Sequence, residues 1–169
     1  KYKAFGIDTS PEDRKMPGVY NVKWLGFNYR MTDFQASLGY NQIISYKKNL
    51  KRRHQIAKRY IKNFSNLENI KFMKYSKDCS FFIFQIFCEN RDGLLKDLKY
   101  KNIGVSVHYA NPLPKMTYYK NKYNLKSSNF VKSNIYGKTN ISLPIYPKLT
   151  NKEIDYISNK IINFINHEK

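Results

Sequence analysis

The segment GFNYRM, residues 26–31, combines an amide, Asn28, with a guanidinium, Arg30, immediately before a helix start. An amide donor and a planar cation beside a helix N-terminus suit a phosphate or a carboxylate ligand. A solvated turn leading into a capped helix would have the same composition. From the residues alone, both interpretations stay open.

A second segment, SVHYANPLPKM at 106–116, places His108 and Tyr109 at the end of a strand-like stretch and before a proline-rich loop. Ordered loops at strand ends commonly carry ligand-binding groups, and histidine is a frequent choice among them. A lone histidine at such a position is nevertheless more often a structural residue. The segment is therefore a candidate binding site with a structural alternative.

The rest of the sequence contains no recognisable catalytic set. It has no P-loop, no GxGxxG, no HExxH and no GxSxG motif. The three histidines lack metal-ligand spacing, so no metal site is expected. Cys79 and Cys88 form no CxxC pair, and two structural thiols suit a reducing compartment such as the cytoplasm.

A long helix is predicted over 34–66, directly after the first candidate segment. Thr32 and Gln35 form a capping box at its start, and its second half carries one apolar stripe. Its first half is apolar on several sides, so we expect it to be covered on several sides, between domains or subunits. The apolar residues of that half are Phe34, Ala36, Leu38, Ile43 and Ile44.

The elements after this helix predict a small domain that carries the second candidate segment. Apolar runs of strand length alternate with short helical patterns, and Thr150 with Glu153 opens a final helix. The fold class is therefore α+β: a long interdomain helix plus a small two-layer α/β sandwich with a mostly antiparallel sheet. The expected strands are 70–75, 80–89, 105–109 and 141–145, and the expected helices before the final one are 91–101, 115–122 and 129–136.

The formal net charge of +19 raises the alternative of a polyanion-binding surface. Eight lysines and arginines fall within 47–62, and no carboxylate lies between Asp33 and Glu68. Lysines that solvate the whole surface would give the same charge, and this stretch lacks the glycines and aromatic platforms of single-strand-binding modules. Nucleic acid is therefore the less favoured partner. No apolar run of about 18 residues exists, so no membrane association is expected.

Four blocks of the sequence together resemble the DegT/StrS family of nucleotide-sugar aminotransferases, which have the aspartate aminotransferase fold. They occur in the order in which the family has them, over roughly residues 20–165, and the first is the most specific. The resemblance implies a linking loop at 1–33, the long helix at 34–66 and a C-terminal small domain at 67–169. The blocks are LGFNYRMTDFQASLGYNQI, RRHQIAKRYIKNF, SVHYANPLPKMTYY and ISLPIYPKLTNKEIDYI.

The resemblance also implies an activity. The family transfers an amino group, with glutamate the expected donor, to a nucleotide-linked keto-sugar in polysaccharide or sugar biosynthesis. It uses pyridoxal 5'-phosphate (PLP) and acts as a homodimer with shared active sites. The family's Schiff-base lysine lies on a large domain upstream of Gly26. No catalytic residue is therefore expected in this chain, and the chain alone is expected to be inactive.

Particular residues match positions of the family. Asn28 matches the residue that reaches the PLP phosphate of the other subunit, and Arg30 is expected near the same site. His108 matches a position near the sugar substrate, and Tyr109 matches in type. The family's proline comes one residue earlier than Pro112 does, so this loop is longer or aligned differently. Two alternatives remain: a basic nucleic-acid-binding module, and an inactive remnant domain.

Overall fold

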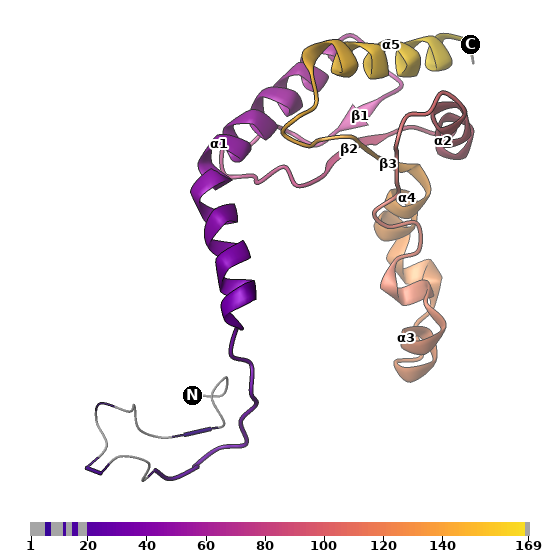
Figure 1. The fold of residues 1–169 in the computed structure, drawn as a ribbon. Helices are drawn as coiled ribbons and strands as arrows, with labels where there is room; N and C mark the ends of the chain where they lie inside the picture. The colour runs from indigo at the N-terminus through magenta and orange to yellow at the C-terminus, as the bar shows by residue number, and fades with distance from the viewer. Residues whose placement is uncertain (1–5, 8–11, 13–14, 17–19, 168–169) are drawn as a thin grey trace. The chain divides into compact units, whose positions relative to one another are not determined.

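A computed structural model of the chain describes residues 6–7, 12, 15–16 and 20–167 (Figure 1). The chain divides into two compact units, Lys1–Tyr46 and Lys47–Lys169, and each is described by itself. Part of the predicted linking loop at 1–33 lies outside the described residues.

The long helix, α1, spans Asp33–Phe64, close to its predicted bounds. The predicted capping box at its start is confirmed in both directions. The Thr32 N–H donates to Gln35 Oε1 at 3.0 Å, and the Gln35 N–H donates to Thr32 Oγ1 at 3.3 Å. These bonds satisfy donors that the first turn of a helix otherwise leaves without a partner.

The first half of α1 presents its large apolar side chains to solvent. Phe34 is 74% exposed and Ile43 is 73% exposed, and Leu38 and Ile44 are also exposed. Such a face is costly for an isolated helix and is typical of an interaction surface. That it packs between domains or subunits stays a prediction.

The second unit is built around a three-stranded sheet in the order β1-β2-β3, with both pairs antiparallel. In the β2–β3 register, Phe84 faces Leu143 and Ile86 faces Ile141. Because successive side chains alternate between faces, these four residues share one face of the sheet. The strands are Lys71–Phe72 (β1), Phe84–Phe87 (β2) and Asn140–Leu143 (β3), so the predicted mostly antiparallel sheet is confirmed with shorter strands.

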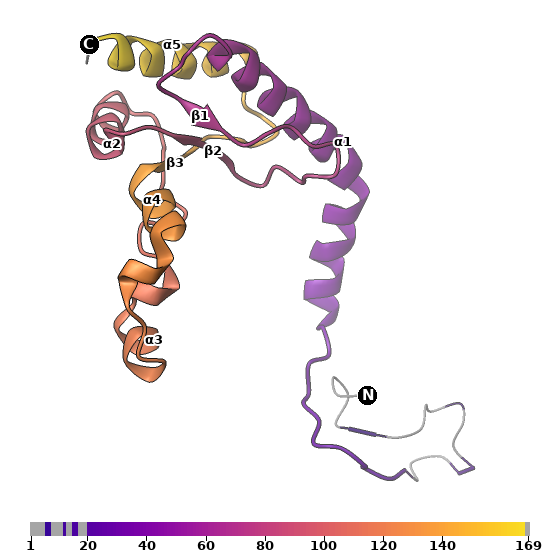
Figure 2. The ribbon, with the colours of Figure 1, turned by 180° about the vertical axis from the view of Figure 1, so that it is seen from behind.

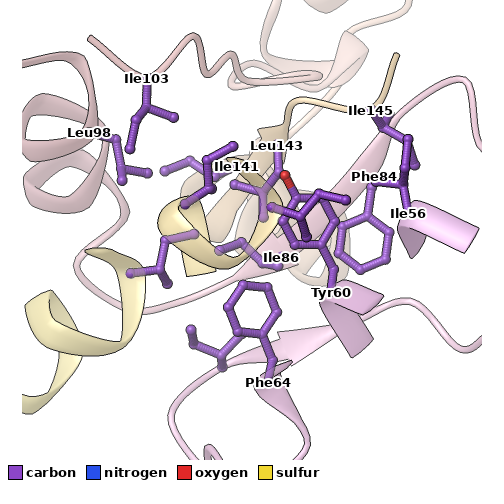
Figure 3. Packing of buried hydrophobic residues seen from close by; sticks show 14 of the residues in the cluster. Ile56, Tyr60, Phe64, Phe84, Ile86, Leu98, Ile103, Ile141, Leu143 and Ile145 are labelled. Carbon is purple, nitrogen blue, oxygen red and sulfur yellow. The ribbon is translucent and has the colours of Figure 1, made fainter. Parts of the chain in front are cut away.

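The apolar face of the sheet forms the core together with the second half of α1 and the last helix, α5 (Asn151–His167). Figure 3 shows Tyr60, Phe64 and Phe84 among the aliphatic side chains of this cluster. The Tyr60 ring stacks on those of Phe64 and Phe84, with centroids 5.9 and 5.2 Å away. Its hydroxyl donates to the Pro144 carbonyl at 3.1 Å, and burial raises the pKa of that hydroxyl. Each aromatic ring thus removes a large apolar area from water.

The other predicted helices are also present. The last helix, α5, begins after the Thr150–Glu153 capping box, whose hydrogen bonds form as expected. Helix α2 ends before Asn102, which adopts a left-handed φ of 57°. In Figures 1 and 2, α4 and α5 lie on opposite sides of the sheet. The remaining elements are α2 (Arg91–Tyr100), η1 (Leu113–Lys115), α3 (Thr117–Lys122), η2 (Ser127–Phe130) and α4 (Val131–Thr139).

The strand predicted at 105–109 is wrong. Only Ser106 pairs with the sheet, through an isolated bridge to Ser142. The Ser106 N–H donates to the Ser142 carbonyl at 3.2 Å, and the Ser142 N–H donates back at 2.7 Å. After this bridge the backbone of 107–109 leaves β3, and side chains replace the ladder as its hydrogen-bond partners. The segment has the residue types of a strand. Its sequence does not show that side chains, rather than a neighbouring strand, bind its backbone groups.

Candidate functional site

The first candidate segment precedes α1, and the ribbon that leads into this helix is drawn out rather than coiled (Figure 1). The rings of Phe27 and Tyr29 stack with their centroids 5.1 Å apart and their planes 6° apart. Residues two apart lie on the same side of an extended chain. Asn28 and Arg30 therefore project from the side opposite the stacked rings, and both are exposed.

The donors of this segment fit an anionic group. Among the described residues, the Asn28 side chain makes no hydrogen bond, so its amide is available as a donor. An amide and a guanidinium placed two residues apart before a helix start suit a phosphate monoester. That Asn28 and Arg30 bind an anion stays a prediction.

The second candidate segment lies in the second unit and is held by the polar face of the sheet. His108 is half-buried, and its Nδ1 lies 2.9 Å from Ser142 Oγ. The His108 N–H donates to Asn140 Oδ1 at 3.1 Å, and its carbonyl accepts from Gln85 Nε2 at 2.7 Å. Both the ring and the backbone of His108 are therefore bound by buried neighbours.

Tyr109 follows with its side chain 71% exposed. Its carbonyl accepts from Asn140 Nδ2 at 3.4 Å, and its ring meets that of His108 edge to face, with centroids 5.4 Å apart. Since Ser142 binds Nδ1, the Nε2 atom is the imidazole nitrogen left for an external group. An exposed phenol beside an imidazole nitrogen suits the hydroxyl groups of a polar ligand.

Three residues of this site were missed by sequence reasoning: Gln85, Asn140 and Ser142. Each is polar, lies in a strand and is buried. The signal was present but weak, because Gln85 interrupts the apolar run FFIFQIF, while Asn140 and Ser142 are two residues apart. What connects them to His108 is side-chain hydrogen bonding across 23 to 34 residues of sequence.

The arginines of the 47–62 stretch are used in packing. Arg59 forms a two-pronged ion pair with Asp155 of α5, with Nε 2.7 Å from Oδ1. Arg52 donates to the Leu149 carbonyl and to Asn151. This use of guanidiniums inside the fold weakens the case for a nucleic-acid surface on α1, because arginine is the stronger phosphate ligand.

The described residues contain no group of three or more His, Cys, Asp or Glu side chains arranged to hold a metal ion. A bilayer would not be crossed by any helix in the described part of the chain, because none combines sufficient length with sufficient apolarity.

Comparison with known proteins decides the family. The model of the DegT/DnrJ/EryC1/StrS aminotransferase family matches residues 1–162. The chain belongs to this family. The resemblance predicted from the four sequence blocks is thereby confirmed.

Two relatives illustrate the match. An uncharacterized protein of Methanocaldococcus jannaschii is 32% identical over 158 residues, which cover 89% of this chain and 41% of that protein. The UDP-4-amino-4,6-dideoxy-N-acetyl-beta-L-altrosamine transaminase of Campylobacter jejuni is 29% identical over 152 residues, which cover 86% of this chain and 40% of that enzyme. The chain therefore spans about two-fifths of the length of these relatives.

A solved structure agrees with the family assignment. The PMP-form of the putative sugar aminotransferase Spr1654 from Streptococcus pneumoniae superposes with a TM-score of 0.81 at 27% identity, covering 94% of this chain and 42% of that protein. The α+β architecture of this chain is thus the architecture of one portion of an aminotransferase.

Proposed function

We propose that this chain forms the C-terminal part of a PLP-dependent aminotransferase that moves an amino group from an amino acid to a nucleotide-linked keto-sugar. The observation that carries the proposal is the family match over nearly the whole chain, together with a sugar aminotransferase portion of the same fold. Glutamate is the proposed donor, and synthesis of a cell-surface polysaccharide is the proposed setting. In fold terms, residues 67–169 would be the small domain of a fold-type I PLP enzyme.

Asn28 and Arg30 would bind the cofactor phosphate. When bound, PLP supplies the electron sink for the chemistry at the amino-bearing carbon. The amide of Asn28 and the cation of Arg30 would fix the phosphate end and thereby the orientation of the ring. In the proposed homodimer, Asn28 serves the site of the partner protomer. The exposed apolar residues of the first half of α1 are then explained, because they would be covered in the assembled protein.

His108 and Tyr109 would bind the sugar. The imidazole offers Nε2 and Tyr109 offers an exposed hydroxyl, so both can orient a pyranose through its hydroxyl groups. The positive charge of the surface would favour the diphosphate of the nucleotide. No residue of the chain is assigned as the covalent nucleophile. We propose that the lysine comes from the portion of the family that these 169 residues do not match.

The test compares this chain with a protein that also contains that portion. With PLP, glutamate and a nucleotide-linked keto-sugar, the longer protein is expected to form the amino sugar, while residues 1–169 alone form none. The PLP absorbance of the short chain should not respond to glutamate. A cofactor absorbance band in the short chain that disappears on addition of glutamate would overturn the assignment of the lysine. Absence of amino-sugar formation by a folded, PLP-loaded longer protein would overturn the function.

A further inference from the structure

The second face of the β2–β3 pair is polar and yet buried. In the register, Gln85 faces Ser142 and Asn140 lies two residues before Ser142, so the three side chains share this face. Their exposed fractions are 2% for Gln85, 0% for Asn140 and 5% for Ser142. Buried polar groups are costly unless each finds a partner, so their hydrogen bonds indicate why they are placed here.

The Asn140 side chain uses its full hydrogen-bonding capacity. Its oxygen accepts from the His108 N–H at 3.1 Å and from Gln85 Nε2 at 3.4 Å. Its Nδ2 donates to the Tyr136 carbonyl at 2.7 Å and to the Tyr109 carbonyl at 3.4 Å. One amide thus joins the end of α4 to both residues of the candidate sugar site.

Gln85 completes the arrangement from the neighbouring strand. Its Nε2 donates to the His108 carbonyl at 2.7 Å, and its Oε1 accepts from the Tyr136 hydroxyl. Tyr136 is itself fixed by a ring contact with Phe87 of β2, with centroids 5.2 Å apart. Gln85 and Asn140, named the carboxamide pair from here on, therefore bind three backbone groups of the His108–Tyr109 segment.

These three backbone hydrogen bonds matter because the His108–Tyr109 segment no longer pairs with the sheet. Its regular backbone pairing stops at the Ser106–Ser142 bridge. Beyond that point the carboxamide pair replaces the missing strand ladder, and the imidazole is tied separately through Nδ1 to Ser142. Backbone position and ring orientation are thus set by two different contacts.

We propose that Gln85 and Asn140 are positioning residues that fix the backbone of His108 and Tyr109, and that Ser142 orients the imidazole so that Nε2 faces the ligand. That the ligand is a nucleotide-linked sugar rests on the proposed function. The positioning itself does not rest on it, because it concerns only the contacts within this chain.

The positioning is tested without cofactor or substrate, by NMR on the 169-residue chain. The chain has three histidines, so a His108→Gln variant identifies the ring signals of His108. In Asn140→Ala, exchange of the His108 N–H with solvent should accelerate about tenfold or more, the effect of losing a buried acceptor. Amides of the apolar core, such as that of Ile86, should stay protected. Unchanged exchange at His108 would overturn the proposal.

The Ser142→Ala variant tests the contact of the His108 ring separately from the contacts of the His108 backbone. It should change the ring nitrogen shifts of His108, which report the tautomer, while His108 N–H exchange stays slow. The matched control is Asn63→Ala, which removes another partly buried amide that donates to Asp155 and Ser158. This control is expected to lower stability without altering either His108 signal. Equal changes in Asn63→Ala and Asn140→Ala would mean a general loss of structure and would overturn the proposal.

If Asn140→Ala does not fold, the same NMR measurements on Gln85→Leu test the positioning. Leucine suits a buried strand position, so this variant is expected to fold. His108 ring and amide signals that match those of the unaltered chain would then refute the proposal. In the longer PLP-loaded protein, Gln85→Leu should raise KM for the sugar nucleotide more than it lowers kcat. An inactive longer protein with the expected NMR changes would refute the proposed function and leave the positioning supported.

Discussion

Among single residues, a few side chains make contacts that differ from what their types alone suggest. His108 could have been an ordinary structural histidine, and its ring and backbone are indeed tied into the fold. Those ties use Nδ1 and the peptide groups, so they orient the residue and leave Nε2 for a ligand. Asn28, in contrast, is exposed and has no side-chain hydrogen bond among the described residues, as suits a group that acts on something outside its own unit.

Asn28→Ala is predicted to weaken PLP retention in the longer, cofactor-binding protein. A hydrogen bond to a charged phosphate contributes roughly 1.5–3 kcal/mol, so the dissociation constant of PLP should rise by about ten- to a hundredfold. Equilibrium dialysis or the PLP absorbance after gel filtration measures this directly. Asn21→Ala, an exposed asparagine of the same unit, is the matched control and should leave retention unchanged. Equal PLP retention in Asn28→Ala and in the unaltered protein would remove Asn28 from the phosphate site.

At the scale of the element, local signals predicted the helices well and the sheet less well. The capping boxes at Thr32 and Thr150 depend on residues three apart, so the sequence displays them directly. The segment 105–109 has strand propensity, but its partners are amide side chains from other elements, which no local pattern reveals. Gln85 and Asn140 could not be assigned to the site for the same reason, because they reach His108 through side-chain hydrogen bonds from residues distant in sequence. The resemblance to a family indicated His108, but it did not indicate what holds it.

Acid is predicted to loosen the contact between α1 and α5. Hydrogen bonding to Arg59 lowers the pKa of Asp155, and hydrogen bonds from Thr150 lower the pKa of Glu153. A carboxyl whose pKa is lower in the folded state stabilises the fold fully above its ordinary pKa of about 4. That contribution is lost as the pH falls through the lower, folded value. The urea midpoint should therefore be constant at neutral pH and decline below about pH 4.

Asp155→Asn should reduce this decline, because it removes one of the carboxyls that cause it. Asp78→Asn, at an exposed turn outside the α1–α5 contact, is the control and should keep the pH dependence of the unaltered chain. If the urea midpoints of Asp155→Asn and the unaltered chain fell in parallel with acid, the Arg59–Asp155 pair would not link the helices in the way described.

At the scale of the whole molecule, the chain is a member of the DegT/DnrJ/EryC1/StrS aminotransferase family that spans about two-fifths of the length of its relatives. Its apolar α1 surface and its outward Asn28 both have a ready explanation in an assembly with further protein. Under the proposed function, one protomer supplies Asn28 to the active site of its partner. Charge alone would not require such an assembly, and a surface that binds nucleic acid would not need these apolar residues.

Complementation between two impaired variants of the longer protein, assayed at a PLP concentration too low to load Asn28→Ala, tests whether protomers share Asn28. One variant carries Asn28→Ala, and the other carries an Ala replacement of its PLP-binding lysine. In a mixed dimer, one of the two sites combines an intact lysine from the first protomer with an intact Asn28 from the second. Aminotransferase activity is therefore predicted to rise well above that of either variant alone when the two are unfolded and refolded together. Mixed dimers that form but show no more activity than the better of the two parents would contradict the sharing of Asn28 between protomers.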